Sequence, residues 1–404
     1  SILDWSAARG IGFSQLTSLG DMADVDFGDL LDYLSQDYHT RAILLYIEAI
    51  THARKFMSAA RAASRIKPVI VVKAGRHAQG ARAALSHTGA LAGSDAVYDM
   101  AFRRAGMLRV LTLEELFDAV QTLALSRIPK GNRLAILTNG GGIGVLATDD
   151  LVEQGGRLSN LSKETTRRLN EVLPPNWSKA NPVDIIGDAP GSRYADALRI
   201  LAEDKGVDAT LVLNCPTAAA STTGAAEAIV GVAKEYKKHP ILTSWAGEQV
   251  ANEARQIFTK HRIPTYLTPE QAVRAFAHLA DYRLNQELLI ETPPSLPEVF
   301  TPNVKKTHGQ IGWVLTQNRH WLTQPETTKV LTAYGIPVVE SHTVKSARKA
   351  ADIAAQLGVP VALKMVSPDI THKSDVGGVI LNLSLIHISE PTRLLVQSRM
   401  PSCA

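Results

Sequence analysis

The stretch Ser86-His87-Thr88-Gly89-Ala90-Leu91-Ala92-Gly93-Ser94-Asp95 lies between an apolar run, residues 68–73, and an amphipathic segment that starts near Asp95. Such a run is typical of a buried parallel strand, and the segment after it of a helix. Glycines let backbone N–H groups close around a ligand, and a helix N-terminus favours negative charge. The stretch therefore predicts an α/β connection whose loop suits a phosphorylated imidazole at His87. A lone histidine is more often a surface-loop residue, so the flanking sequence has to decide.

Outward from this stretch, apolar strands alternate with amphipathic helices. Strands are predicted at residues 11–18, 42–48, 68–73 and 108–111, and helices at 27–33, 53–66, 94–105 and from 113 onward. This βαβα alternation is typical of a parallel sheet covered by helices on both faces. We therefore assign residues 1–127 to one flavodoxin-like α/β domain.

The same pattern restarts after Pro129. Strands are predicted at 134–137, 209–214 and 241–244, and helices at a segment ending near Gly155 and at 194–202, 225–236 and 249–261. Two consecutive domains fit the restart better than one sheet, so residues 131–290 are predicted to form a second flavodoxin-like domain. Clustered prolines predict a linker over residues 291–325. A third unit, residues 326–382, follows, with helices near 327–333 and 347–357, an apolar segment at 336–339 between them, and a strand at 359–364.

Several segments carry a resemblance to one family. Residues 86–95, the preceding Lys73-Ala74-Gly75-Arg76, the following AFRRAGMLRV of residues 101–110 and the upstream Tyr46-Ile47-Glu48 resemble the NDP-forming acyl-CoA synthetases. Succinyl-CoA synthetase and ADP-forming acetyl-CoA synthetase belong to that superfamily. The resemblance covers residues 1 to about 382. It implies an α/β protein with two consecutive flavodoxin-like domains followed by the truncated start of an ATP-grasp domain, which residues 360–364 and 367–379 resemble.

The resemblance implies a reaction and its catalytic residues. Phosphate passes from ATP to His87 and then to an acyl group, ending as acyl-CoA, with acetate the expected acid. Thr88 and Gly89 would cradle the phosphate, and Glu48 matches the catalytic glutamate of the family. A carboxylate bonded to the imidazole fixes its tautomer and stabilises the cation formed on phosphorylation. Without His87, a surface charge at a strand end would be the better interpretation of Glu48.

A triple glycine, Gly140, Gly141 and Gly142, lies between a predicted strand and helix. By itself this pattern indicates a tight connection, and no Gly-Lys-Ser/Thr follows as in a nucleotide P-loop. The resemblance implies that the helix points its N-terminus at the phosphohistidine, so that the glycines cradle phosphate. Asn181-Pro182-Val183-Asp184 also matches a family segment, and a loop-capping Asn/Asp pair explains it equally well.

Nucleotide chemistry is expected in the third unit. Lys364 matches the lysine that contacts ATP phosphates in ATP-grasp domains. His372 fits either a second phosphate-carrying histidine or an exposed polar turn. The implied cofactors are ATP or ADP and Mg²⁺, with coenzyme A as a substrate, and no metal ligand is assigned in this chain. Cys215 lacks a His/Asp partner pattern and is interpreted as a structural thiol.

Composition excludes several function classes. The net charge of +4 is small for 404 residues and the basic residues are dispersed, so nucleic-acid binding is not indicated. The two cysteines cannot form a disulfide framework, which suits a reducing cytoplasm. No apolar run approaches the roughly 20 residues that span a bilayer. We expect a cytoplasmic enzyme for small-molecule substrates, homo-oligomeric at full length.

The last residues have a separate origin in our interpretation. Leu383 to Arg393, LSLIHISEPTR, is identified as the translation of a transposase sequencing adapter, and Ser398 to Ala404 differs in one residue from that of the flow-cell adapter. An ordinary terminal strand and tail is the alternative. We expect residues 383–404 to be adapter-derived and the chain to be an internal fragment. Such a fragment would be inactive alone, because the CoA-binding domain of the family is missing.

A second function remains open. Residues 1–48, 94–125 and 326–382 resemble bacterial proteins that fuse this synthetase module to a GNAT acetyltransferase. In protein lysine acetyltransferases of that type, the synthetase half can act as a regulatory acyl-CoA sensor. Retention of His87 and Glu48 favours a working ligase, and it disfavours a non-catalytic scaffold.

Overall fold

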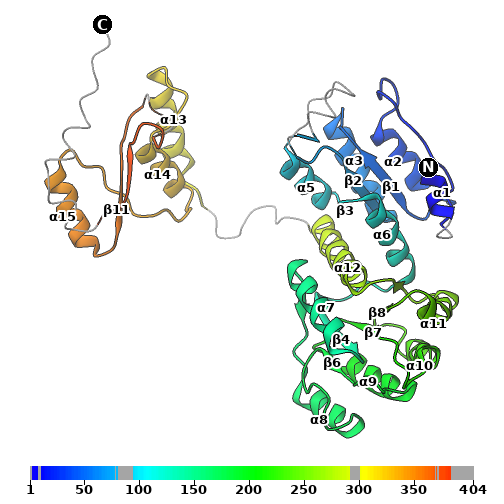
Figure 1. Ribbon diagram of the computed structural model, residues 1–404. Helices are drawn as coiled ribbons and strands as arrows, with labels where there is room; N and C mark the ends of the chain where they lie inside the picture. Colours follow the sequence, from blue (N-terminus) through cyan, green and yellow to red (C-terminus); the bar gives the residue numbers. More distant parts are fainter. Residues whose placement is uncertain are drawn as a thin grey trace. The chain divides into compact units, whose positions relative to one another are not determined.

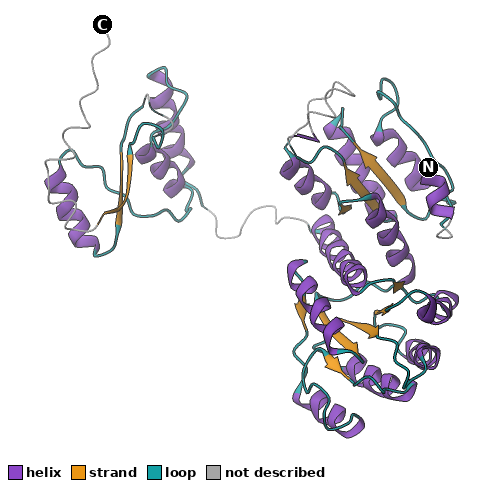
Figure 2. Cartoon of the chain, viewed as in Figure 1, coloured by secondary structure: helices purple, strands orange, loops and turns teal. Residues whose placement is uncertain are grey.

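A computed structural model describes residues 2–7, 11–77, 79–80, 94–291, 301–368, 370 and 373–383 (Figures 1 and 2). The chain divides into two units, residues 1–292 and residues 293–404, and each is described by itself. Both units combine helices and strands. The first contains two parallel sheets, which confirms the predicted α/β class with two consecutive parallel-sheet domains.

Three parallel strands in the order β1-β2-β3 form the first sheet. The elements of this domain are α1 (Ile2–Ala7), α2 (Phe27–Gln36), β1 (Ile43–Ile47), α3 (Ala53–Ile66), β2 (Val69–Lys73), α5 (Asp95–Arg104), β3 (Leu108–Val110) and α6 (Leu113–Leu125). Every residue of β2 is buried, because its sequence VIVVK lies at the centre of the sheet. Alternate strand side chains enter two apolar clusters, one with α2, α3 and α5 and the other with α6.

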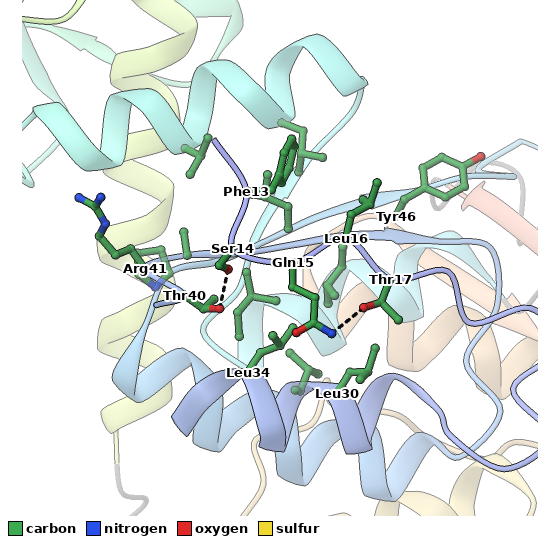
Figure 3. A pocket seen from close by; sticks show the side chains of 18 of the residues that line it. Phe13, Ser14, Gln15, Leu16, Thr17, Leu30, Leu34, Thr40, Arg41 and Tyr46 are labelled. Atoms are coloured by element: carbon green, nitrogen blue, oxygen red, sulfur yellow. Dashed lines mark hydrogen bonds between the residues drawn. The ribbon is translucent and has the colours of Figure 1, made fainter. Parts of the chain in front are cut away.

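The segment 11–18 is not a strand, contrary to our prediction. It follows an irregular path near β1, and its side chains supply the contacts that a backbone ladder would have made (Figure 3). Phe13 packs edge-on against Phe117 of α6 with ring centroids 6.3 Å apart. The Ser14 hydroxyl bonds the Thr40 hydroxyl at 2.8 Å. Phe13 is therefore half-buried by packing against a helix and not by a place in the sheet.

Six parallel strands form the second sheet, in the order β5-β4-β7-β8-β9 with β6 also paired to β4. Its elements are β4 (Arg133–Thr138), α7 (Gly141–Glu153), β5 (Arg157–Leu158), α8 (Lys163–Val172), β6 (Val183–Asp184), α9 (Gly191–Glu203), β7 (Ala209–Asn214), α10 (Thr222–Glu235), β8 (Ile241–Trp245), α11 (Gln249–Lys260), β9 (Thr265–Tyr266) and α12 (Pro269–Ile290). Short strands β5, β6 and β9 and helix α8 are additional to the predicted elements.

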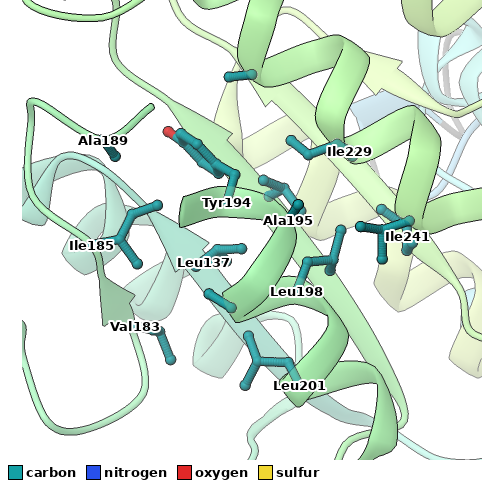
Figure 4. Close-up of a cluster of buried hydrophobic side chains, with 14 of the residues drawn as sticks. Leu137, Val183, Ile185, Ala189, Tyr194, Ala195, Leu198, Leu201, Ile229 and Ile241 are labelled. Atoms are coloured by element: carbon teal, nitrogen blue, oxygen red, sulfur yellow. The ribbon is translucent and has the colours of Figure 1, made fainter. Parts of the chain in front are cut away.

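Helices cover both faces of this sheet as well. On one face, α9, α10 and α11 bury a cluster that contains Tyr194 and Trp245, both completely inaccessible to solvent (Figure 4). On the other face, α7 and α12 pack over Ile136, Leu211 and Leu242. The sheet is therefore buried on both sides, as its continuous apolar strands predicted.

The long helix α12 was not predicted, and it joins the two sheet domains. Its Asn285 side chain donates to the Met107 carbonyl at 2.8 Å, and Gln286 donates to the Gly106 carbonyl at 2.7 Å, both at the start of β3. Nearby, the hydroxyls of Thr122 on α6 and Tyr266 on β9 are 2.5 Å apart and buried. These contacts hold the two sheet domains together.

Helix α13 (Val304–Thr316) opens the second unit, which continues with α14 (Gln324–Ala333), α15 (Ala347–Leu357), β10 (Val361–Lys364) and β11 (Val379–Leu383). The two strands pair antiparallel and pack with α15 around Ala354. Residues 304–316 were expected in the linker, but the prolines stop at Pro302, and Asn303 caps a regular helix by accepting from the Lys306 N–H. The segment 336–339 forms no strand. Residues 384–404, the predicted adapter-derived tail apart from Leu383, lie outside the described residues.

Within the described residues, no helix has both the length and the apolar composition needed to cross a bilayer. Nor does this part of the chain hold three or more His, Cys, Asp or Glu side chains grouped as a metal site.

Candidate functional site

Two candidate residues, Glu48 and Lys73, lie at the carboxyl edge of the first sheet. Glu48 directly follows β1, and Lys73 ends β2, whose register places Ile47 beside Lys73. Parallel strands gather ligands at this edge. Glu48 thus lies at the end of a strand, as predicted. His87, Thr88 and Gly89 lie outside the described residues, so the expected contact between Glu48 and His87 stays a prediction.

Glu48 is half-buried and lies on the wall of a cavity of about 2050 Å³. The cavity extends along β1 between α2, α6 and the segment 11–22, and Figure 3 shows Tyr46, Leu16 and Leu30 among its lining side chains. Burial, and secondarily the Glu48 charge, raise the pKa of the Tyr46 phenol.

Sequence reasoning used Lys73 only as part of a motif and missed its burial. Its residue is 3% exposed, its ammonium donates to the Ala74 carbonyl, and its Nζ lies 4.7 Å from the centroid of the Tyr98 ring. Burial lowers the pKa of Lys73, and the nearby Asp95 partly opposes this. The burial of Lys73 could have been predicted from its place at the end of the apolar run of residues 68–73.

The second sheet presents the glycine turn at its own carboxyl edge. The Thr138 hydroxyl donates to the Gly140 carbonyl and accepts from the Gly140 N–H, each at 3.0 Å, which turns the chain into α7. A Cβ on Gly140 would lie 2.9 Å from the Cys215 sulfur. Glycine at 140 is therefore explained by packing against β7. The structural role expected of Cys215 fits this contact, and burial raises the pKa of its thiol.

Gly141 and Gly142 differ from Gly140. A Cβ on Gly141 would lie 3.0 Å from the Asp184 carboxylate, whereas a Cβ on Gly142 would meet nothing within 4 Å. Gly140, the N-cap of α7, has no side chain to cap the first N–H groups. The N-terminus of α7 can therefore accept an anion beside Gly142, although the Asp184 charge lies close by.

The hydrogen bonds distinguish between the two interpretations of residues 181–184, a functional family segment and a structural Asn/Asp pair. The Asn181 amide donates to the Leu134 and Ser159 carbonyls, both at 3.0 Å, and accepts from the Ile136 N–H at 2.9 Å. It thus bridges β4 to the chain after β5 and is structural. Asp184 accepts from the Ile186 N–H at 2.9 Å through one oxygen and directs the other towards Gly141.

In the second unit, Lys364 ends β10 opposite Val379 and is exposed. This is the strand-end position predicted for it, and its ATP contact stays a prediction. The proposed second carrier, His372, lies outside the described residues.

Three domain families match consecutive parts of the chain. Residues 1–123 match the succinyl-CoA ligase-like flavodoxin domain, residues 134–288 the ligase-CoA domain, and residues 313–387 an ATP-grasp domain. The fold is accordingly two ligase domains built on parallel sheets, followed by part of an ATP-grasp domain.

Curated relatives extend this likeness. The chain is 40% identical over 390 residues to acetate–CoA ligase [ADP-forming] I of Archaeoglobus fulgidus, covering 95% of this chain and 54% of that protein. It is 38% identical to acetate–CoA ligase [ADP-forming] of Methanocaldococcus jannaschii, and 33% identical to 4-hydroxybutyrate–CoA ligase [ADP-forming] of Nitrosopumilus maritimus, each over 95% of this chain and 54% of the relative. The chain thus spans about half the length of these relatives.

A solved structure is also similar. It is the dinucleotide forming acetyl-coenzyme A synthetase 1 of Ca. Korarchaeum cryptofilum in complex with phosphate and ADP, with a TM-score of 0.67 and 37% identity. The match covers 73% of this chain and 64% of that one.

Proposed function

The domain models, the curated relatives and the solved structure all support membership of this chain in the NDP-forming acetyl-CoA synthetase family, and from that membership we propose that its protein makes acetyl-CoA. Acetate, coenzyme A and ATP are the proposed substrates, and ADP and phosphate the other products. In this proposal Mg²⁺ accompanies the nucleotide. The relatives are acid–thiol ligases by name.

We propose phosphohistidine chemistry at His87 for this reaction. The ring nitrogen attacks the γ-phosphorus, forming an N–P bond as the P–O bond to ADP breaks. An acetate oxygen then attacks phosphorus and the N–P bond breaks, giving acetyl phosphate. The coenzyme A thiol, after losing its proton, attacks the carbonyl carbon, and the C–O bond to phosphate breaks. The observation that supports this most is Glu48 at the carboxyl edge of the first sheet, on the strand neighbouring the one that leads into the His87 segment.

The proposed activity is tested with the complete protein. We expect acetate, coenzyme A and Mg-ATP to yield acetyl-CoA with one ADP and one phosphate per turnover, measured by chromatography of the nucleotides. Omitting both acetate and coenzyme A should stop acetyl-CoA formation and leave phosphorylated protein. Release of AMP and pyrophosphate would contradict the proposal, because transfer of the γ-phosphoryl group to His87 leaves the bond between the α- and β-phosphates intact.

A separate prediction follows if the glycine turn, residues 140–142, binds phosphate. Gly142→Ala should leave the unfolding temperature unchanged or raised, because its Cβ meets nothing and alanine favours helix by up to about 1 kcal/mol. It should nevertheless slow phosphoenzyme formation about tenfold or more, since a methyl group would then occupy the space beside the α7 N-terminus where phosphate binds. Both effects are measured on the complete protein, by thermal unfolding and by labelling rate.

Gly140→Ala is the matched control for that variant. Its Cβ would press on the Cys215 sulfur, so it should lower the unfolding temperature. An unchanged labelling rate in Gly142→Ala would mean that the turn is only a tight connection.

The alternative function is regulatory. In it, the chain is the acyl-CoA-sensing half of a GNAT-type lysine acetyltransferase, and the acetyltransferase domain follows it. Both this alternative and the adapter-derived tail are tested by reading the complete gene across Asn382. We expect codons after Asn382 that differ from Leu383–Ala404 and continue an ATP-grasp domain.

A further inference from the structure

Asp184 is a carboxylate at the carboxyl edge of the second sheet to which the proposed reaction gives no role. It ends β6, and the pairing of β6 with β4 places it beside Thr138, two residues before Gly140. A Cβ on Gly141 would lie 3.0 Å from the Asp184 Oδ2 atom. Glycine at 141 therefore lets the carboxylate approach the first residue of α7 closely.

One oxygen of this carboxylate is held, and the other is available to a ligand. Asp184 Oδ1 accepts from the Ile186 N–H at 2.9 Å, and the Asp184 N–H donates to the Ser178 hydroxyl at 3.0 Å. Among the described residues, no basic side chain forms an ion pair with Asp184, and no donor bonds its Oδ2 atom. Asp184 thus presents a half-buried oxygen, fixed in place, that can accept a further hydrogen bond.

Hydrogen-bond donors lie beside this oxygen. The N-cap of α7, Gly140, has no side chain to bond the first N–H groups of the helix, and these groups have no carbonyl partner within the helix. A Cβ on Gly142 would meet nothing within 4 Å, so the space next to them is open. The edge therefore combines N–H donors, which favour an anion, with a carboxylate, which repels one.

An anion that also carries a hydrogen-bond donor satisfies both groups. Inorganic phosphate keeps at least one O–H at neutral pH, whereas sulfate keeps none. Phosphate oxygens can accept from the α7 N–H groups while the phosphate O–H donates to Asp184 Oδ2. Sulfate in the same place would meet the carboxylate with charge repulsion alone.

We propose that Asp184 is the specificity-determining residue of the phosphate site at the glycine turn, where it selects inorganic phosphate over anions that lack an O–H. The inference rests on the proposed function in one respect, which is that phosphate binds beside Gly142. Asp184 accepts a hydrogen bond from phosphate without taking its proton, so no covalent bond forms or breaks. A site that accepts from a ligand O–H discriminates against analogues without one, because its acceptor is then left unpaired.

Calorimetric titration of the complete protein with inorganic phosphate and with sulfate, in the absence of nucleotide, tests this. The wild type should bind phosphate about 10- to 100-fold more tightly than sulfate, the usual effect of one hydrogen bond to a charged group. Asp184→Asn keeps the shape of the side chain and the bond from Ile186 but removes the charge. Sulfate should then bind more tightly, and the ratio of the two affinities should fall towards one.

Two further variants separate selection from binding. Asp188→Asn makes the same change on an exposed carboxylate that pairs with Arg193 at 2.6 Å, and it should leave the affinity ratio at the wild-type value. Gly142→Ala should weaken both anions alike, because its methyl group fills the open space beside the donors. Thermal unfolding of each variant checks the fold.

An unchanged affinity ratio in Asp184→Asn would overturn the proposal, even if the variant unfolded at a lower temperature, and so would a wild type that binds both anions equally. Unchanged affinities in Gly142→Ala would refute phosphate binding at the turn and the selection with it. Each of these results is distinguishable from failure of the proposed reaction, because binding is measured without turnover. A protein that selects phosphate through Asp184 but never forms acetyl-CoA would refute the reaction and leave the selectivity assigned.

Discussion

His87→Ala in the complete protein is expected to abolish the phosphoenzyme that forms with γ-labelled ATP and Mg²⁺, and acetyl-CoA formation with it. Alanine has no ring nitrogen, and no other side chain in residues 86–95 offers a comparable nucleophile at neutral pH. In the wild type the label should be acid-labile and base-stable, because an N-phosphoryl imidazole hydrolyses once protonated. Acetate and coenzyme A should discharge it.

The matched control is His261→Ala, which removes an exposed histidine after α11 and should label at the wild-type rate. Labelling that persists at full rate in His87→Ala would refute the phosphohistidine mechanism. A wild-type protein that binds acetyl-CoA yet never becomes labelled would instead favour the regulatory alternative.

Glu48→Gln is expected to slow phosphorylation of His87 about 30- to 1000-fold while leaving the fold intact. Glutamine keeps the shape of the side chain but loses the negative charge that stabilises the imidazolium-like state. In a half-buried site such a charge contributes about 2–4 kcal/mol to the transition state. Single-turnover labelling measures the step directly, and thermal unfolding checks the fold.

Glu253→Gln provides the comparison, because it makes the same chemical change on an exposed face of α11. It should label at the wild-type rate. If Glu48→Gln also did so, Glu48 would be no more than a surface charge at the end of β1.

Elements with a strong local period were predicted closely from sequence. Helices α3 (Ala53–Ile66) and α15 (Ala347–Leu357) and strand β7 (Ala209–Asn214) have the predicted bounds. In each, the apolar spacing is set by which face is buried, and that spacing is readable within one segment. The restart after Pro129 likewise predicted a second sheet.

The secondary-structure predictions that failed share one cause. In each case, contacts with residues far away in the sequence determined the structure of the segment. The segment 11–18 has a strand-like composition, but Phe117 and Thr40 contact its side chains and no strand pairs with its backbone. Helix α12 escaped prediction because it is buried on several sides, between two sheets, and shows no single apolar stripe. Helix α13 follows prolines that hid its start.

The sequence by itself determined the α/β class, the two sheet domains, the family resemblance and the strand-end positions of Glu48 and Lys364. These follow from local periodicity and from short motifs. Only the tertiary structure decided that Asn181 bridges backbone groups of other strands, that Gly140 is required by Cys215, and that Lys73 is buried. The physical reason is that a hydrogen bond, a steric limit or a desolvated charge belongs to a pair of groups, and the second member of each pair lies far away in the chain or is a solvent that the fold has excluded.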